Sequence, residues 1–159
     1  QLKDFIENVG TKIVLVLGRF SPTRIATLKK IKVELRKRGY IPVLFDFDKP
    51  GNKTILETVQ LIAHLSLFVV ADFSDAKIVL AELEKVVDNT SVPVVPIIIE
   101  SQKIPPTLRE KQVTSAKVLG TVQYNDDQEL IDIMDNKIIK PAVKKAEEIR
   151  EAMSRIYEG

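Results

Sequence analysis

The fold of this chain is best approached from the stretch Leu67-Phe68-Val69-Val70-Ala71-Asp72-Phe73-Ser74-Asp75, followed by Ala76-Lys77-Ile78-Val79-Leu80-Ala81-Glu82. It opens with an apolar run that contains β-branched residues, as is typical of a buried strand. The run breaks at short polar residues and then resumes with helical spacing. In open parallel α/β sheets, ligands bind at the carboxyl ends of the strands. The stretch therefore predicts a strand, a polar turn and a helix that carries Glu82 near a site.

Further strands are predicted on both sides of this stretch. Lys12–Leu17 and Val92–Ile99 are near-continuous apolar runs, which indicate strands buried on both faces of a parallel sheet. Ile41–Phe47 predicts another strand, and Pro42 near its start favours a sheet edge or a strand end. Lys117–Val122 predicts the last strand. Proline at two positions of the fourth strand removes backbone donors, so we expect that strand to be kinked or only partly paired.

Helices are expected between these strands, over the following ranges: Ser21 to about Arg38, Thr54–Leu65, the turn after Ser74 to Asp88–Asn89, a short helix after Pro105-Pro106, and Asp126 to about Arg155. For the first helix we expect Ser21 as N-cap, Pro22 at the first helical position and Gly39 as the stop. Its expected apolar stripe is Ile25, Leu28, Ile31, Val33 and Leu35. The last helix is expected to bend at Pro141.

Alternating strands and helices predict the fold class: a flavodoxin-like α/β domain with a five-stranded parallel sheet, strand order 2-1-3-4-5, and helices on both faces. In this order the chain reverses direction across the sheet between strands 1 and 3. The loops after Leu17 and Ala71 are then expected to face each other across one crevice.

Composition excludes several classes of function. The 159 residues are 45% hydrophobic and 29% charged, as expected of one soluble domain. The lack of cysteine excludes thiol nucleophiles and Cys metal sites, and the single histidine, His64, argues against a multi-His metal site. A net charge of +2 argues against nucleic-acid binding. Since no apolar run reaches the roughly 18 residues of a membrane span, we expect a cytoplasmic protein.

The start of the chain indicates its domain organisation. It begins with Gln1 rather than Met, so we expect a domain excised from a longer protein with flanking domains. Residues 1–11, with the amphipathic piece Leu2–Val9, are expected to form a leader or linker. Residues 12–159 are expected to form the α/β domain.

The loop Gly18-Arg19-Phe20-Ser21-Pro22-Thr23-Arg24 is a candidate binding element, although it is neither a dinucleotide fingerprint nor a P-loop. It combines a helix start with a hydroxyl group, and helix starts bind anions. Arg19 or Arg24 offers a bidentate contact to phosphate, and Phe20 offers a face for stacking on a base. In the alternative interpretation, Ser21 is only a cap and the arginines are solvated.

The polar turn and Glu82 also allow two interpretations. Asp72 and Ser74 are either site residues or ordinary turn and capping residues. Glu82 is either a catalytic carboxylate or a surface residue that pairs with Lys85, a contact worth about 0.2–0.5 kcal/mol.

The order of these features resembles a TIR (Toll/interleukin-1 receptor) domain, most closely the divergent bacterial type. Lys12–Ser21 matches the first strand and its serine-containing loop, and Pro50-Gly51 matches the end of an Arg-Asp-x-x-Pro-Gly loop consensus. Ser74 matches a strand-end serine. Glu82 matches the glutamate of a Ser-x-Trp-Cys-x-x-Glu helix pattern. The fourth strand is also shared, so the resemblance covers about Lys12–Ile133.

The chain departs from the TIR pattern at two places. The loop before Pro50 is one residue short and lacks the arginine. Ile78 and Val79 stand where the family has Trp and Cys.

The resemblance implies cleavage of the nicotinamide–ribose bond of NAD⁺, with Glu82 as the essential residue. Nucleoside 2-deoxyribosyltransferases share the sheet and a similarly placed glutamate. A carboxylate stabilises the oxocarbenium-like transition state of such cleavage. NAD⁺ is then the substrate, and no further cofactor is implied. The substrate-binding residues expected with this function are Gly18, Arg19, Phe20, Ser21, Arg24, Asp72, Phe73 and Ser74.

The resemblance also implies partners. TIR enzymes commonly act when assembled, so we expect a homo-oligomer formed through TIR–TIR contacts of the loop Asp48, Lys49, Pro50 and Gly51. The protein would be the effector domain of a bacterial immune or signalling protein, as in antiviral defence. The alternative is a non-catalytic TIR-like module that binds a nucleotide or self-associates. The missing Trp and Arg favour this alternative, whereas Glu82, Ser74 and the polar first loop favour the enzyme.

Overall fold

The computed structural model describes residues 12–47, 53–75 and 79–158. The predicted leader (residues 1–11) and the predicted interface residues Asp48, Lys49, Pro50 and Gly51 lie outside these ranges.

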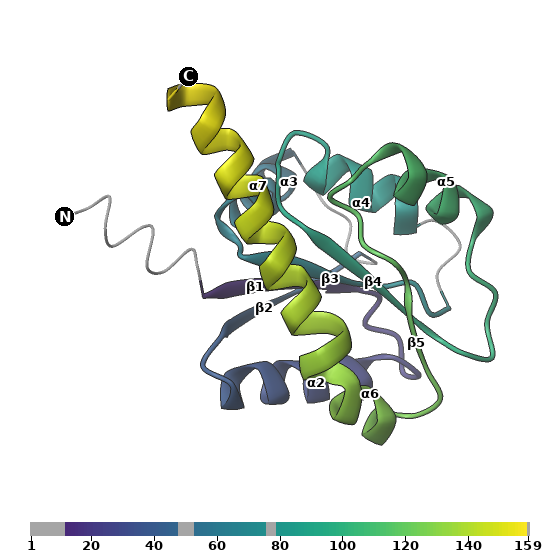
Figure 1. The fold of residues 1–159 in the computed structure, drawn as a ribbon. Helices are drawn as coiled ribbons and strands as arrows, with labels where there is room; N and C mark the ends of the chain where they lie inside the picture. Colours follow the sequence, from purple (N-terminus) through teal and green to yellow (C-terminus); the bar gives the residue numbers. More distant parts are fainter. Residues whose placement is uncertain (1–11, 48–52, 76–78, 159) are drawn as a thin grey trace.

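The described residues form one parallel sheet with the order β2-β1-β3-β4-β5 (Figure 1). Its strands are β1 (Ile13–Gly18), β2 (Ile41–Asp46), β3 (Phe68–Asp72), β4 (Val94–Ile99) and β5 (Val122–Tyr124). All four pairs of neighbouring strands are parallel, and β2 lies at an edge, as Pro42 indicates. The predicted fold class and strand order are therefore confirmed.

Helices cover both faces of the sheet (Figure 1). One face is covered by α3 (Lys53–Leu65), α4 (Val79–Val87) and α5 (Pro106–Thr114). The other face is covered by α2 (Ile25–Lys37), α6 (Asp127–Ile133), the π-helix η1 (Met134–Ile139) and the start of α7 (Lys140–Glu158).

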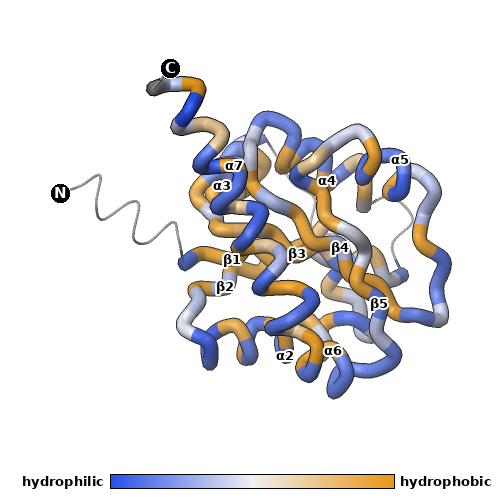
Figure 2. Tube along the Cα trace, in the orientation of Figure 1, coloured by the Kyte–Doolittle hydropathy of each residue, from blue (hydrophilic) through white to orange (hydrophobic). Residues whose placement is uncertain are grey.

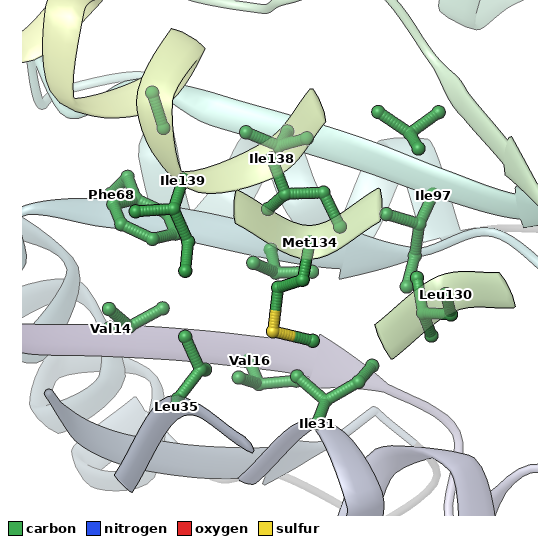
Figure 3. Close-up of a cluster of buried hydrophobic side chains, with 14 of the residues drawn as sticks. Val14, Val16, Ile31, Leu35, Phe68, Ile97, Leu130, Met134, Ile138 and Ile139 are labelled. Atoms are coloured by element: carbon green, nitrogen blue, oxygen red, sulfur yellow. The ribbon is translucent and has the colours of Figure 1, made fainter. Parts of the chain in front are cut away.

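Two apolar cores follow from the alternation of side chains along the strands. In β1, Val14 and Val16 face α2, α6 and η1, whereas Leu15 and Leu17 face the helices of the other side. Figure 3 shows the first of these cores, in which Ile31 of α2 and Met134 of η1 point toward β1. The apolar colour in Figure 2 follows the strands, and the outer turns of the helices are polar, as a sheet buried on both faces requires.

The first helix differs from its prediction at its start and in its stripe. It begins at Ile25, and Ser21 does not cap it: the Ser21 hydroxyl contacts the Thr23 hydroxyl at 3.1 Å, while the Ser21 carbonyl accepts from the Ile25 amide at 2.9 Å. Val33 is 48% exposed because it lies two residues from Ile31, about 200° around the helix. The stop at Gly39 is confirmed, with a φ of +88°.

The fifth strand is Val122–Tyr124, so the predicted range Lys117–Val122 was wrong. Of the predicted residues before Val122, Val118 forms an isolated bridge to Val94. On the edge of β4 that faces β5, the Val94 amide donates to the Lys117 carbonyl. The next amide on that edge would belong to Pro96, two residues later, and proline has no N–H to donate. Pairing with β4 therefore stops and resumes at Val122, which confirms that β4 is only partly paired.

The closing helix begins as predicted, with the Asp126 carboxylate accepting from the Glu129 amide at 2.8 Å. It does not continue as one regular helix. The six-residue π-helix η1 ends at Ile139, two residues before Pro141. A proline removes one helical hydrogen bond and clashes with the carbonyl four residues earlier, which lies within η1. The irregularity predicted at Pro141 is thus a wide turn just ahead of it.

Candidate functional site

The candidate site lies at the carboxyl ends of β1 and β3, which are neighbours in the sheet with Leu17 opposite Ala71. This is the place where the strand order reverses, the usual ligand site of open α/β folds. The loop after β1 contacts the end of β3, the turn that follows it and the first turn of α4 through three side-chain pairs.

The backbone of the first loop is fixed against the edge strand. The Gly18 carbonyl accepts from the Phe47 amide at 2.9 Å, and the Phe20 amide donates to the Asp46 carboxylate at 3.1 Å. A Cβ at Gly18 would lie 3.1 Å from a methyl group of Leu28, so the loop packs closely on α2. These contacts determine where Arg19, between Gly18 and Phe20, leaves the sheet.

Arg19 and Glu82 form the outer pair of the site. The Nη2 atom of Arg19 lies 3.9 Å from Oε1 of Glu82, and the two side chains are 19% and 22% exposed. Glu82 is in the first turn of α4, so its carboxylate is directed toward the loop after β1 rather than into bulk solvent. The pair brings together two residues that the sequence analysis named independently.

Arg24 and Asp72 form the inner pair, with side chains only 2% and 1% exposed. The Arg24 Nε donates to Asp72 Oδ2 at 2.9 Å, and its Nη2 donates to the hydroxyl of Tyr124 in β5. The other Asp72 oxygen accepts from the Ser74 amide at 3.1 Å, and the Ser74 hydroxyl accepts from the Ile99 amide at 2.9 Å. Buried hydrogen bonds thus join the ends of β3, β4 and β5 to the first loop.

Burial governs the ionisation of this inner pair. Burial raises the pKa of the Asp72 carboxyl above its ordinary value, although Arg24 and the Ser74 amide act in the opposite direction. Burial alone would lower the pKa of Arg24, but Asp72 and Tyr124 raise it, so the guanidinium remains charged. Burial and the nearby Asp72 also raise the pKa of Tyr124, which keeps its hydroxyl protonated.

Burial divides the predicted site residues into two groups. Arg24, Asp72 and Ser74 are bonded to one another and to the backbone, and Phe73 is 2% exposed within the core beneath α4. These four residues support the site from behind. The residues of the prediction that retain partial exposure are Arg19, Phe20, Ser21 and Glu82, and Gly18 contributes its backbone.

A third, exposed contact was missed by the sequence analysis. Asp75 accepts from the Thr23 hydroxyl at 3.0 Å, and its amide donates to Gln102 Oε1 at 2.7 Å, while Gln102 Nε2 donates back to the Asp75 carboxylate. Asp75 has a φ of +57°, a left-handed conformation that aspartate adopts more readily than most residues. The turn chemistry of Asp75 was visible in the sequence, but its partner 27 residues away was not.

Few other features of the described residues could form a site. Within the described ranges no group of His, Asp or Glu side chains could hold a metal ion. None of the helices in this part of the chain is both long and apolar enough to cross a bilayer. A cavity of about 280 Å³ between β2 and α3 is apolar, and its described lining contains none of the predicted site residues. His64 is exposed in the last turn of α3.

Comparison with known proteins gives structural matches without sequence matches. No family model and no curated protein matches the chain. The CMP N-glycosidase BcmB of Clostridium botulinum matches with a TM-score of 0.59 and 11% identity, over 77% of this chain and 97% of BcmB. A mutant flavo di-iron protein of Thermotoga maritima matches with a TM-score of 0.58 and 15% identity, over 88% of this chain but only 37% of its own length. The diflavin flavoprotein A3 of Nostoc matches with a TM-score of 0.58 and 10% identity, over 87% and 96% of the two chains.

These matches establish the fold and no more. The chain has a flavodoxin-like parallel α/β fold that resembles both an N-glycosidase and flavodoxin-type domains. The TIR family, which the sequence resembles, is not among the matching families, because no family model matches.

Proposed function

We propose that this domain is an N-glycosidase that acts on a nucleotide and that its substrate is NAD⁺, cleaved at the nicotinamide–ribose bond. The observation that carries the proposal is the Glu82 carboxylate, 22% exposed and 3.9 Å from Arg19 at the carboxyl edge between β1 and β3. The likeness of fold to a CMP N-glycosidase supports the class of reaction. The resemblance to TIR domains supports NAD⁺ as the substrate.

Glu82 has the chemistry that such a reaction needs. Departure of the base leaves positive charge on the ribose C1′ and ring oxygen, and a nearby carboxylate stabilises that charge. Water then completes the hydrolysis by attacking C1′, with loss of a proton. Nicotinamide leaves as a neutral base, so NAD⁺ cleavage needs no strong acid to protonate the leaving group.

The accessible residues of the first loop would bind the rest of the nucleotide. Phe20 lies partly buried against the core, which leaves part of its ring for stacking on a base. Arg19 would contact the pyrophosphate, and Ser21 would donate a hydrogen bond to a phosphate or ribose oxygen. The first loop would be held in position by the buried residues behind it, which are Arg24, Asp72, Phe73 and Ser74.

The wider role that we propose follows from the TIR resemblance. The domain would be the effector part of a longer bacterial immune or signalling protein and would act as a homo-oligomer. The predicted interface residues Asp48, Lys49, Pro50 and Gly51 would mediate that assembly.

A non-catalytic nucleotide-binding domain is the second candidate. It is favoured by the ion pair itself, because Arg19 offsets the charge of Glu82 when no ligand is bound. Two of the matching structures are flavoproteins, whose fold class binds its ligand at the same sheet reversal.

The two candidates are separated by measuring release of the base. The protein, at increasing concentration to allow assembly, is incubated with NAD⁺ or with CMP, and free nicotinamide or cytosine is quantified by chromatography. We expect release of nicotinamide from NAD⁺ and loss of that release in Glu82→Gln.

The matched control is Glu84→Gln, which removes an equal charge from the same helix. Glu84 lies near Lys111 at 3.9 Å and takes no part in the candidate site. Binding of either nucleotide without release of a base, over the whole concentration range, would support the non-catalytic domain and contradict the enzyme.

A further inference from the structure

The outer half of α7 (residues 149–157) continues an apolar stripe that begins in the core of the domain. The side chains of this stripe recur at alternating spacings of four and three residues, which keeps them on one helix face: Ala142, Ala146, Ile149, Met153 and Ile156. Ala142 is buried in the core, whereas Met153 is 41% and Ile156 is 70% exposed. Since all residues from 150 to 157 are exposed, no element of the described ranges covers the outer half of the stripe.

This stripe leaves the domain at the end of the sheet where β1 begins. Ile139, one residue before α7, lies beside Phe68 at the start of β3 (Figure 3). Phe68 in turn is opposite Val14 of β1. From there α7 runs away from the sheet, and its end lies on the same side of the domain as the start of β1 (Figure 1). The chain that precedes Lys12 therefore enters the domain on the side toward which the stripe extends.

We propose that the outer half of the stripe is the docking surface for the chain's own N-terminal segment, residues 2–9, bound as a short amphipathic helix. The apolar residues of this segment have the spacing of one helix face: Leu2, Phe5, Ile6 and Val9. Gly10 follows them as a helix stop. Docking removes the apolar faces of both helices from water. It does not depend on the proposed glycosidase function.

The lengths and directions of the two helices agree with this docking. Eight helical residues are about 12 Å long, and α7 advances about 10 Å from Ile149 to Ile156. Residues 10–12 span up to about 10 Å when extended, the distance that α7 advances between Ala142 and Ile149. The segment runs toward the sheet and α7 runs away from it, so the helices are antiparallel. Val9 then lies near Ile149, and Leu2 lies near Ile156.

The charges beside the stripe argue against a second copy of α7 as its partner. Lys145 and Arg150 flank the stripe at the positions that face the partner in a two-helix assembly. A second α7 would therefore place basic side chains against basic side chains, which repel one another. The N-terminal segment carries Asp4, Glu7 and a single base, Lys3, so it brings no such repulsion. Its tether to the domain also gives it an effective concentration in roughly the millimolar range.

Introduced cysteines test the docking without background, because the chain contains no cysteine of its own. The double variants Val9→Cys/Ile149→Cys and Leu2→Cys/Ile156→Cys are oxidised in dilute solution, and intrachain disulfides are quantified by mass spectrometry. A disulfide requires its two Cα atoms to lie within about 7 Å of each other. We expect both pairs to form at least about tenfold faster than a pair that docking does not bring together.

The matched control pair is Val9→Cys/Val113→Cys. Val113 is 87% exposed on α5, which covers the opposite face of the sheet from α7. Equal rates of disulfide formation in the control and in the two test pairs would overturn the docking. Rapid formation of disulfide-linked dimers by the single variant Met153→Cys would also overturn it, because a second copy would then cover the stripe.

A second test leaves α7 unchanged and alters only the segment. Phe5→Asp places a charge on the apolar face of the segment, whereas Asn8→Asp adds the same charge away from that face. Hydrogen exchange of the amides of residues 152–157 is followed by NMR in the full chain. We expect exchange to become about tenfold faster or more in Phe5→Asp, because undocking exposes large apolar side chains. Exchange should stay at the wild-type rate in Asn8→Asp. Wild-type rates in both variants would contradict docking of this segment.

Discussion

Two arginine–carboxylate pairs connect the loop after β1 with the segment that begins at β3, and they differ in depth. The inner pair, Arg24 and Asp72, is 2% and 1% exposed, has a 2.9 Å contact and is extended by Tyr124 and Ser74. The outer pair, Arg19 and Glu82, is 19% and 22% exposed and is 3.9 Å apart.

This difference in burial indicates different roles for the two pairs: a structural role for the inner pair and a role in substrate binding or catalysis for the outer pair. Burying two charges costs several kcal/mol per ion unless geometry and extra hydrogen bonds offset it, so the inner pair cannot exchange partners freely. The outer pair is partly exposed and lies at the carboxyl edge between β1 and β3, where this class of fold binds its ligands. We infer that the first pair fixes the two loops and that the second is available for substrate.

The strongest way to break the comparison is to remove the inner arginine. Arg24→Met leaves Asp72 buried without its cation, and we expect the free energy of unfolding to fall by about 3–5 kcal/mol. Urea denaturation followed by circular dichroism measures this loss. A loss below about 1 kcal/mol, the size expected of a surface pair, would contradict the structural role of the inner pair.

The pH dependence of stability tests the inner pair through the ionisation of the Asp72 carboxyl. Because burial raises the folded-state pKa of Asp72 above the unfolded value, the native protein binds this proton more tightly than the unfolded chain. The stabilisation that this bound proton gives the folded state is complete below about pH 4, and it is lost as the pH rises through the raised pKa of Asp72. The stability advantage of wild type over Asp72→Asn should therefore narrow as the pH rises from about 4, as measured by denaturation at each pH. An advantage that widens with pH would mean that Arg24 outweighs burial and lowers this pKa.

Tyr124→Phe probes the extension of the inner pair to β5. It keeps the ring and removes only the hydroxyl that accepts from Arg24 Nη2. Hydrogen bonds to charged groups contribute about 1.5–3 kcal/mol, so we expect the free energy of unfolding to fall by about that amount. Tyr157→Phe, at an exposed position near the end of α7, is the control and should leave stability unchanged. Equal free energies of unfolding for Tyr124→Phe and Tyr157→Phe would show that the hydrogen bond between Arg24 and Tyr124 does not stabilise the fold.

Arg19→Met should have the smallest effect on folding. Its pair with Glu82 is partly exposed and long, so the expected loss in free energy of unfolding is below about 1 kcal/mol. The same denaturation assay measures it beside Arg24→Met. A loss as large as that of Arg24→Met would show that both pairs support the fold and would end the distinction between them.

The strand order could be predicted from the sequence because each strand is a nearly unbroken apolar run and parallel crossovers follow few rules. The start of β5 could not, because it depends on an interruption caused by Pro96 in the neighbouring strand. Val33 was assigned to the buried stripe on composition, whereas the angle around α2 places it outside.

The candidate site could be predicted as a location and as a set of residues, but not as contacts. Arg19, Arg24, Asp72 and Glu82 were all named from strand-end position and from family resemblance. The sequence could not show which arginine would be buried, because that depends on Tyr124, which is 100 residues from Arg24. As an alternative to a catalytic role, the sequence offers Lys85 on the same helix as a partner of Glu82, whereas the structure pairs Glu82 with Arg19 of the first loop.

The central claim is that Glu82 acts in catalysis and is not needed for the stability of the fold. It is tested most directly by measuring nicotinamide release from NAD⁺ and the free energy of unfolding on the same Glu82→Gln sample. We predict a fall in release of about 100-fold or more, with a change in unfolding free energy below about 1 kcal/mol. Release at the rate of the wild type and of Glu84→Gln, from a variant that is equally folded, would contradict the account.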